Sequence, residues 1–368
     1  MILEIANSDA PQTLDALINP VTRVFLERPL IPLSLKFWIL FLYYKIRFNN
    51  QTAYVLALVR YLKVAAVVTF TDNYSFLGVV NSVIPTCRVV AIGIGFRTRD
   101  QYIQIKSILE TVCEDHSQKL HDIYLCWGQR DVDLLNELGI AANLIIPIGS
   151  IRDHIFRASN PLFSEKIELL VSYHRIGLLS EEGVNPIEKS RKASASVLIK
   201  YLETYCADNN IKPVFLLRPG DQEYLNAQIQ EIDKSYRGPW IPSSTEGKSP
   251  SYSTIAKSKV IVGIRSSILV EALGHHKKVL ACNMTDDPNL GLFEESICQL
   301  TNPRYSDFSE RLTHLRCMTE IEWFDAVDDL ASRYISTDKR DVHLKLSNFL
   351  DMIVNNRINA AIESLSSD

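Results

Sequence analysis

The sequence lacks the short motifs that assign a nucleotide-binding or hydrolytic function directly. It contains no G-x-G-x-x-G after a predicted strand, no G-x-x-x-x-G-K-[ST], no H-E-x-x-H and no G-x-S-x-G. Gly93-Ile94-Gly95 supplies two glycines of the first motif without the third. No cluster of metal ligands stands out, and the carboxylate pair Asp286-Asp287, in a loop, is the one alternative left open. The sequence therefore argues against a P-loop nucleotidase, a zinc peptidase and an α/β-hydrolase, and we expect neither a metal nor a cofactor.

Paired cysteines, a strong basic charge and internal repeats are absent as well. The seven cysteines show no C-x-x-C and no pairing rhythm, which predicts reduced core thiols in a cytoplasmic protein. A net charge of −4 and a pI near 6.1 argue against a protein that coats nucleic acid. The first residues lack the basic start and apolar core of a secretion signal. With 368 residues, 46% of them hydrophobic, the chain has the length of about two globular domains.

One stretch, residues 34–48, points to a membrane surface. Its sequence, SLKFWILFLYYKIRF, is rich in aromatic residues and carries Lys36, Lys45 and Arg47, but it is too short to span a bilayer. Such a segment can lie at the interface with its rings buried and its cations facing lipid phosphates. The alternative is an ordinary helix of the first domain that packs under the sheet. We therefore expect a cytoplasmic protein that is either free or peripheral on the inner membrane.

Short β-branched runs alternate with helical patterns along most of the chain. This order predicts parallel sheets with helices on both faces, hence an α/β fold of two Rossmann-like domains. We expect a first domain at 1–156, a second at 157–340 and a final helix at 341–368 that packs back across the domain seam. The predicted strands are 65–70, 88–94, 122–127, 143–148, 167–171, 214–217, 260–264 and 278–282. The predicted helices include 12–26, 35–60, 76–82, 131–138, 189–207, 223–235, 252–257, 305–315, 321–334 and 342–365.

Residues 259–283 (KVIVGIRSSILVEALGHHKKVLACN) read as strand, tight turn, helix and strand, and the rest of the chain is organised around them. Ser266 and Ser267 fall where the first strand ends and the helix begins. A serine pair there caps the helix and directs hydroxyls and backbone N–H groups at one point, which is how α/β folds hold a phosphate. Glu271 lies one helical turn further, where its carboxylate can accept bonds from a ribose. The alternative is a capped βαβ unit without a ligand.

Polar residues follow several of the predicted strands, and the carboxyl ends of parallel strands are where such folds bind ligands. Three guanidinium groups near a helix N-terminus suit a diphosphate, although any one of them could instead form an ion pair. The predicted acceptor-binding residues are Arg97, Arg99 and Arg130. The predicted donor-binding residues are Arg175, Arg218, Pro219, Arg265, Ser266, Ser267 and Glu271.

Asp72 is the predicted base or nucleophile, because it follows an apolar strand where partial burial can raise the pKa of a carboxyl group. Asn73 beside it would orient a substrate hydroxyl group. The pair also suits a helix cap before residues 74–82, so this alternative stays open. His174 is a second candidate base, and a structural hydrogen-bonding role is its alternative.

These residues resemble those of GT-B glycosyltransferases of bacterial surface-polysaccharide and O-antigen synthesis, closest to the group that uses CMP-activated acidic sugars. Bacterial sialyltransferases of this fold carry a His-Pro motif and a later Ser-Ser/Thr motif that contact CMP; the corresponding positions here are Arg218-Pro219 and Ser266-Ser267. Arginine thus replaces the family's histidine. Asp72-Asn73, Glu271-Ala272-Leu273 and residues 277–280 also match the wider group, and the resemblance covers most of residues 60–285.

The resemblance implies a metal-independent glycosyltransferase of lipopolysaccharide or related polysaccharide synthesis, with two domains that face each other across a cleft. The first domain (1–156) would bind the acceptor and the second (157–340) the nucleotide sugar. Its donor would be a CMP-linked sugar such as CMP-Kdo or CMP-sialic acid, its acceptor a glycan or a lipid-linked glycan, and it would bind no nucleic acid. Two alternatives remain: a UDP-sugar or CDP-glycerol-type transferase of the same fold, and a non-catalytic scaffold that binds a nucleotide.

Overall fold

The structure is a computed structural model, and it describes residues 2–5, 23–25, 34–69, 76–93, 95–112, 121–140, 142–152, 167–172, 186–218, 220–245, 250–336 and 342–354. The chain divides into two compact units. The first comprises residues 1–97, 101–154 and 333–368, and the second comprises 98–100 and 155–332. The sequence placed the corresponding boundaries at 156 and 340. Each unit is built on one parallel sheet, so the α/β class with two Rossmann-like domains is confirmed.

The first unit contains a six-stranded sheet in the order β2-β1-β3-β4-β5-β6, in which every neighbouring pair is parallel. Its strands are β1 (Ile2–Ile5), β2 (Arg23–Phe25), β3 (Ala66–Thr69), β4 (Arg88–Ile92), β5 (His121–Cys126) and β6 (Ala142–Pro147). Its helices are α2 (Leu35–Lys45), α3 (Asn50–Leu62), α4 (Phe76–Val83), α5 (Arg99–Val112), α6 (Gln129–Leu138) and α14 (Val342–Val354). Crossover helices between parallel strands must cover the sheet, as the alternation along the sequence predicted.

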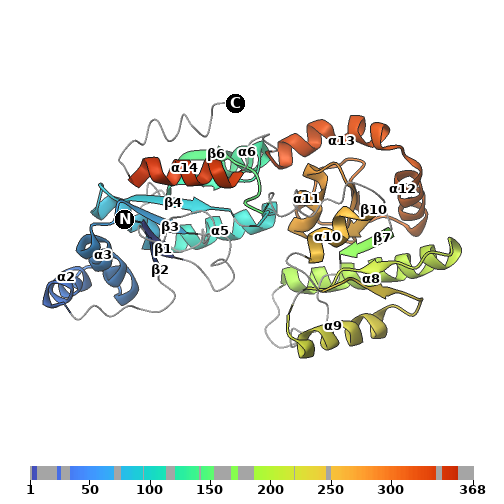
Figure 1. The fold of residues 1–368 in the computed structure, drawn as a ribbon, viewed down its shortest axis with the longest axis horizontal. Coiled ribbons are helices and arrows are strands. Elements are labelled where there is room, and N and C mark those ends of the chain that lie inside the picture. Colours follow the sequence, from blue (N-terminus) through green and yellow to red (C-terminus); the bar gives the residue numbers. More distant parts are fainter. Residues whose placement is uncertain are drawn as a thin grey trace. The chain divides into compact units, whose positions relative to one another are not determined.

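Alternate residues of these strands face opposite sides of the sheet, as the period of two requires. Val68 and Val90 pack in one cluster with α14, whereas Val67 and Val89 pack in another with α3 and α4. The α14 residues in the first cluster follow a helical spacing and are Val342, Leu346, Phe349, Leu350 and Ile353. Figure 1 shows α14, in red, lying along this sheet. The final helix therefore completes the core of the unit in which the chain begins.

The segment that leads back to α14 crosses close to two glycines. The Ser336 backbone N–H donates to the carbonyl oxygen of Trp127 at 2.7 Å. A Cβ atom on Gly128 would lie 2.5 Å from the carbonyl oxygen of Arg333, and one on Gly149 would lie 2.3 Å from that of Ser336. Because these neighbours are backbone atoms, the close approach requires glycine at both positions.

The second unit contains a parallel sheet in the order β12-β11-β10-β7-β8-β9. Its strands are β7 (Ile167–Ser172), β8 (Val214–Phe215), β9 (Ile241–Pro242), β10 (Ser258–Gly263), β11 (Lys278–Asn283) and β12 (Gln299–Thr301). Its helices are α8 (Pro186–Asp208), α9 (Gln222–Ser235), α10 (Pro250–Ala256), α11 (Ser267–Gly274), the 3₁₀ turn η2 (Pro288–Leu290), α12 (Tyr305–Cys317) and α13 (Glu320–Tyr334). The strands β10 and β11 are buried almost throughout, which explains their continuous apolar runs.

Three predictions of secondary structure were wrong or incomplete. Arg23–Phe25 is a strand rather than the end of a helix, and residues 6–22 lie outside the described part. The helix predicted over 35–60 is two helices, because the Asn49 side chain accepts from the Thr52 N–H at 2.9 Å and starts a second helix. Helix α5 was not predicted, although Tyr102, Ile105 and Leu109 recur at a helical spacing. Of the predicted final helix, residues 355–365 lie outside the described part.

Candidate functional site

The carboxyl ends of three neighbouring strands form the candidate site in the second unit. Gly263 at the end of β10 pairs with Ser172 at the end of β7, and Val171 of β7 pairs with Phe215 of β8. Because all three strands are parallel, the residues that follow them emerge at one edge of the sheet. Arg218 and the segment 265–267 therefore follow strands that end at the same edge of this sheet.

Ser266 and Ser267 lie where β10 leads into α11. Ser266 has an extended backbone (φ −139°, ψ 129°) and occupies the N-cap position, but its hydroxyl group makes no capping hydrogen bond. The expected side-chain cap is therefore wrong at Ser266. The Ser266 carbonyl oxygen instead accepts from the Leu269 N–H at 2.9 Å and starts the helix. Both serines are half-buried, and the hydroxyl group of Ser266 remains available for a ligand at the positive end of the helix.

Gly263 sets how closely α11 and β7 approach the end of β10. A Cβ atom there would lie 3.1 Å from the Cβ and the carbonyl oxygen of Ser172 and 3.2 Å from a methyl group of Leu269. A larger residue would have to move these neighbours, and with them the turn that carries Ser266. The glycine therefore supports the geometry of the site through packing.

Glu271 lies one turn into α11 and is 4% exposed. Its Oε2 atom accepts a hydrogen bond of 3.0 Å from the hydroxyl group of Tyr252, which belongs to α10. A buried carboxylate needs such partners, and the bond orients its oxygens. The sequence analysis singled out Glu271 but not Tyr252, because no local pattern connects two residues that lie 19 positions apart on different helices.

Arg218 follows β8, and its backbone is fixed by a buried glutamine. The Arg218 N–H donates to Oε1 of Gln228 at 2.9 Å, and Nε2 of Gln228 donates to the Arg218 carbonyl oxygen at 3.0 Å. Ser243 Oγ accepts from the preceding Leu217 N–H at 2.9 Å. The Arg218 side chain is exposed at the sheet edge. Gln228 was missed, although its spacing of four residues from buried Ile232 in α9 was a usable signal.

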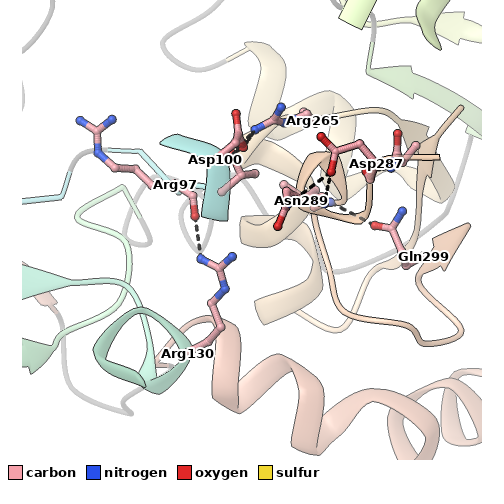
Figure 2. A network of polar contacts seen from close by, with 10 residues as sticks. Arg97, Asp100, Arg130, Arg265, Asp287, Asn289 and Gln299 are labelled. Atoms are coloured by element: carbon pink, nitrogen blue, oxygen red, sulfur yellow. Dashed lines mark hydrogen bonds and ion pairs between the residues drawn. The ribbon is translucent and has the colours of Figure 1, made fainter. Parts of the chain in front are cut away.

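Arg265 is buried and forms an ion pair with Asp100, and it also donates to the hydroxyl group of Thr98 (Figure 2). Thr98 in turn donates to Asp100 at 2.6 Å. Residues 98–100 cluster with the second unit. The positive charge of Arg265 is thus balanced by a carboxylate, which is the ion-pair alternative left open for each arginine. Asp100 was not predicted, because no local pattern connects it with an arginine 165 positions further along the chain.

The predicted acceptor-binding arginines differ in their surroundings. Arg130 donates from Nη1 to the Arg97 carbonyl oxygen at 2.7 Å (Figure 2). The same atom donates to Asp131 at 3.1 Å. Its guanidinium carbon lies 4.9 Å from the centre of the Phe96 ring. Burial raises the pKa of Asp131, and Arg130 opposes that shift. These contacts give Arg130 a structural role in the first unit, and acceptor binding by Arg97, Arg99 and Arg130 stays a prediction.

Five predicted site residues lie outside the described residues: Asp72, Asn73, His174, Arg175 and Pro219. Their catalytic and donor-binding roles stay predictions. Within the described part of the chain, no group of three or more His, Cys, Asp or Glu side chains is arranged to hold a metal ion.

Three solved structures of similar fold cover almost the whole chain. The α,α-trehalose 6-phosphate synthase of Burkholderia multivorans is 11% identical, with a TM-score of 0.53 over 98% of this chain and 99% of that one. The UDP-GlcNAc 2-epimerase of Neisseria meningitidis, bound to UDP-GlcNAc, is 12% identical, with a TM-score of 0.50 over 96% and 99%. The wall teichoic acid polymerase TagF, with CDPG, is 12% identical, with a TM-score of 0.50 over 98% and 89%.

No protein-family model matches the sequence, and no curated protein does. At such low identity the similarity to solved structures establishes a fold and leaves the activity open. The chain has the two-Rossmann-domain fold expected for GT-B proteins, and solved structures of enzymes with more than one reaction type share it.

Proposed function

We propose that the chain is a glycosyltransferase that takes a sugar from a nucleotide-sugar donor bound by the second unit. The observation that carries this proposal is the start of α11 at the end of β10, where Ser266 has an extended backbone and a hydroxyl group not used as a cap. A phosphate bound there would accept from that hydroxyl group and from the first backbone N–H groups of the helix. The same donors would stabilise the charge that develops on the departing nucleotide.

Glu271 and Arg218 would hold the two ends of the nucleotide. The carboxylate of Glu271, oriented by Tyr252, would accept bonds from the ribose hydroxyl groups. The exposed guanidinium group of Arg218, at a neighbouring strand end, would pair with phosphate oxygens. Arg265 would not contact the nucleotide, because its charge is already paired with Asp100. It would instead hold the turn that carries Ser266 in position.

The donor class is a finer part of the proposal. The family resemblance favours a CMP-linked acidic sugar such as CMP-Kdo or CMP-sialic acid. Two proteins of similar fold were solved with UDP-GlcNAc and with CDPG, which makes a UDP-sugar or CDP-linked donor equally reasonable. Asp72 would serve as base or nucleophile towards a glycan or lipid-linked acceptor, with Asn73 and His174 assisting.

Isothermal titration of the full chain with CMP, CDP, UDP and GDP tests the donor site. We expect one nucleotide to bind with a Kd well below 1 mM, and that preference identifies the donor class. Ser266→Ala should weaken its binding about tenfold to a hundredfold, because a hydrogen bond to a charged phosphate is lost. Glu271→Gln should weaken nucleotide binding but leave the affinity for inorganic pyrophosphate unchanged.

Ser196→Ala is the matched control, because Ser196 is exposed on α8 and bonds only to the Lys192 carbonyl oxygen in its own helix. It should bind like the unmodified chain. Failure of all four nucleotides to bind would overturn the proposal. If a nucleotide binds but Asp72→Ala preserves glycan synthesis in cells that need the chain, a non-catalytic scaffold is favoured instead.

A further inference from the structure

Helix α2 exposes a continuous apolar face to solvent. Leu35 is 76% exposed and Ile46 is 82% exposed, and four large side chains between them are at least 40% exposed. The six residues follow the spacing i, i+3, i+4, i+7, i+8 and i+11, so they share one side of the helix. They are Leu35, Trp38, Ile39, Leu42, Tyr43 and Ile46.

The opposite side of α2 accounts for its attachment to the first unit. Phe37 and Tyr44 are buried in the cluster formed with α3 and α4. The Phe37 ring meets the Tyr54 ring at 5.6 Å and the Tyr61 ring at 6.1 Å, both edge to face and both from α3. The helix is thus anchored by one side, and its exposed side contributes nothing to the described core. Exposed large apolar groups lower the solubility of a protein, and on this side they add no packing to the described core.

The charges around this face have one sign. Residues 34–71 contain five cations and no Asp or Glu, whereas the chain as a whole has a net charge of −4. The rest of the chain therefore carries −9. All five cations are exposed, and they are Lys36, Lys45, Arg47, Arg60 and Lys63. Lys45 lies seven residues after Trp38, and Lys36 lies seven before Tyr43, so cations border the apolar face on both sides.

We propose that this face of α2 docks on a bilayer surface that contains anionic lipids. Apolar side chains would enter the acyl boundary while the bordering lysines extend to the lipid phosphates. The 11 residues of α2 are about 16 Å long, so the helix would lie in the plane of the interface. Among the described residues no helix is long and apolar enough to cross a membrane. This proposal goes beyond the donor site and holds whether or not the chain transfers a sugar.

The charges near this face also favour a bilayer over a second copy of the chain as the partner. Two copies that met through this face would bring Lys36 and Lys45 of one copy against those of the other, and α2 has no acid to pair them. An anionic lipid surface is attracted by the same cations.

Flotation of the full chain with vesicles tests the proposal. We expect binding to vesicles of phosphatidylcholine and phosphatidylglycerol in equal parts and little binding to phosphatidylcholine alone. The variant Ile39→Ser/Leu42→Ser/Ile46→Ser should lose binding by more than about a hundredfold. Lys36→Gln/Lys45→Gln/Arg47→Gln should lose at least about tenfold. Trp38 fluorescence should shift to the blue with anionic vesicles.

The matched control replaces three exposed aliphatic residues elsewhere, Ile241→Ser/Ile321→Ser/Leu344→Ser, and should bind as the unmodified chain does. Unchanged melting temperatures show that the variants fold. Binding that is absent, or that survives the α2 serine variant, overturns the proposal. The proposal is also overturned if the unmodified chain does not bind vesicles but light scattering shows a dimer that dissociates in the α2 serine variant. That result would assign the face to a second copy of the chain.

Discussion

Five cysteine thiols are buried within the described part of the chain, at Cys87, Cys126, Cys206, Cys282 and Cys298, and Cys317 is exposed. Burial raises the pKa of the Cys298 thiol from 9.0 to about 12, and nearby Arg311 opposes that shift. The folded chain therefore keeps a proton that the unfolded chain loses as the pH rises above 9. The stability contributed by this group is complete below pH 9 and declines between pH 9 and about 12.

Cys298→Ala should therefore cost less stability at pH 10 than at pH 8. The difference should be about 1.4 kcal/mol, because pH 10 lies one unit above the pKa of the unfolded thiol. Urea unfolding at the two pH values measures it. Val327→Ala, which truncates a buried side chain that does not titrate, is the control and should cost the same at both. An equal cost of Cys298→Ala at both pH values would show that solvent reaches the folded thiol.

At the scale of elements, the segment that returns to α14 depends on the lack of side chains beneath it. Gly128 has an extended backbone (φ −155°) that any residue can adopt, yet a Cβ atom there would meet the backbone of Arg333 and Tyr334. Gly139 at the end of α6 has a positive φ of 66° with nothing within 4 Å. Glycine is therefore needed at position 128 for lack of space and at position 139 for the backbone conformation.

We expect Gly128→Ala to destabilise the chain by about 3 kcal/mol or more, since the backbone of the returning segment must shift. Gly139→Ala should cost only about 1 kcal/mol, the price of a left-handed conformation. Urea denaturation of the two variants compares them directly. The reverse order of the two effects would contradict the close approach of the returning segment to Gly128.

At the scale of the whole molecule, each unit has a core of its own. Phe349 of α14 and Phe308 of α12 are both fully buried, the first in the first unit and the second in the other. The first unit is assembled from three stretches of chain, with its last helix more than 180 residues from β6. That unit therefore cannot complete its core until the C-terminal part of the chain is present.

Phe349→Ala should destabilise the first unit, and Phe308→Ala the second, each by about 3–5 kcal/mol through loss of buried area and a residual cavity. Hydrogen exchange followed by mass spectrometry reads the two units separately. Peptides from β3–β5 should lose protection in the first variant and peptides from β7 and β10 in the second. Equal loss in both units for either variant would mean that they unfold as one cooperative block.

Local patterns predicted most elements because their causes are local. Continuous β-branched runs marked β3, β4, β10 and β11, and a helical repeat of buried residues marked α14. Patterns failed where the signal was uniform. Helix α2 is apolar on most of its sides, so its periodicity could not tell which side packs on α3.

Local residue patterns were sufficient to predict two parallel α/β sheets and the turn that carries Ser266, Ser267 and Glu271 at a strand end, because strand burial and helix starts depend on neighbouring residues. The partners of distant groups became known only from the folded chain. Arg265 pairs with Asp100 across 165 positions of the chain, Gln228 fixes the backbone of Arg218, and α2 keeps one apolar face uncovered. Such pairings depend on chain closure over long distances, and no local pattern of residue types encodes that.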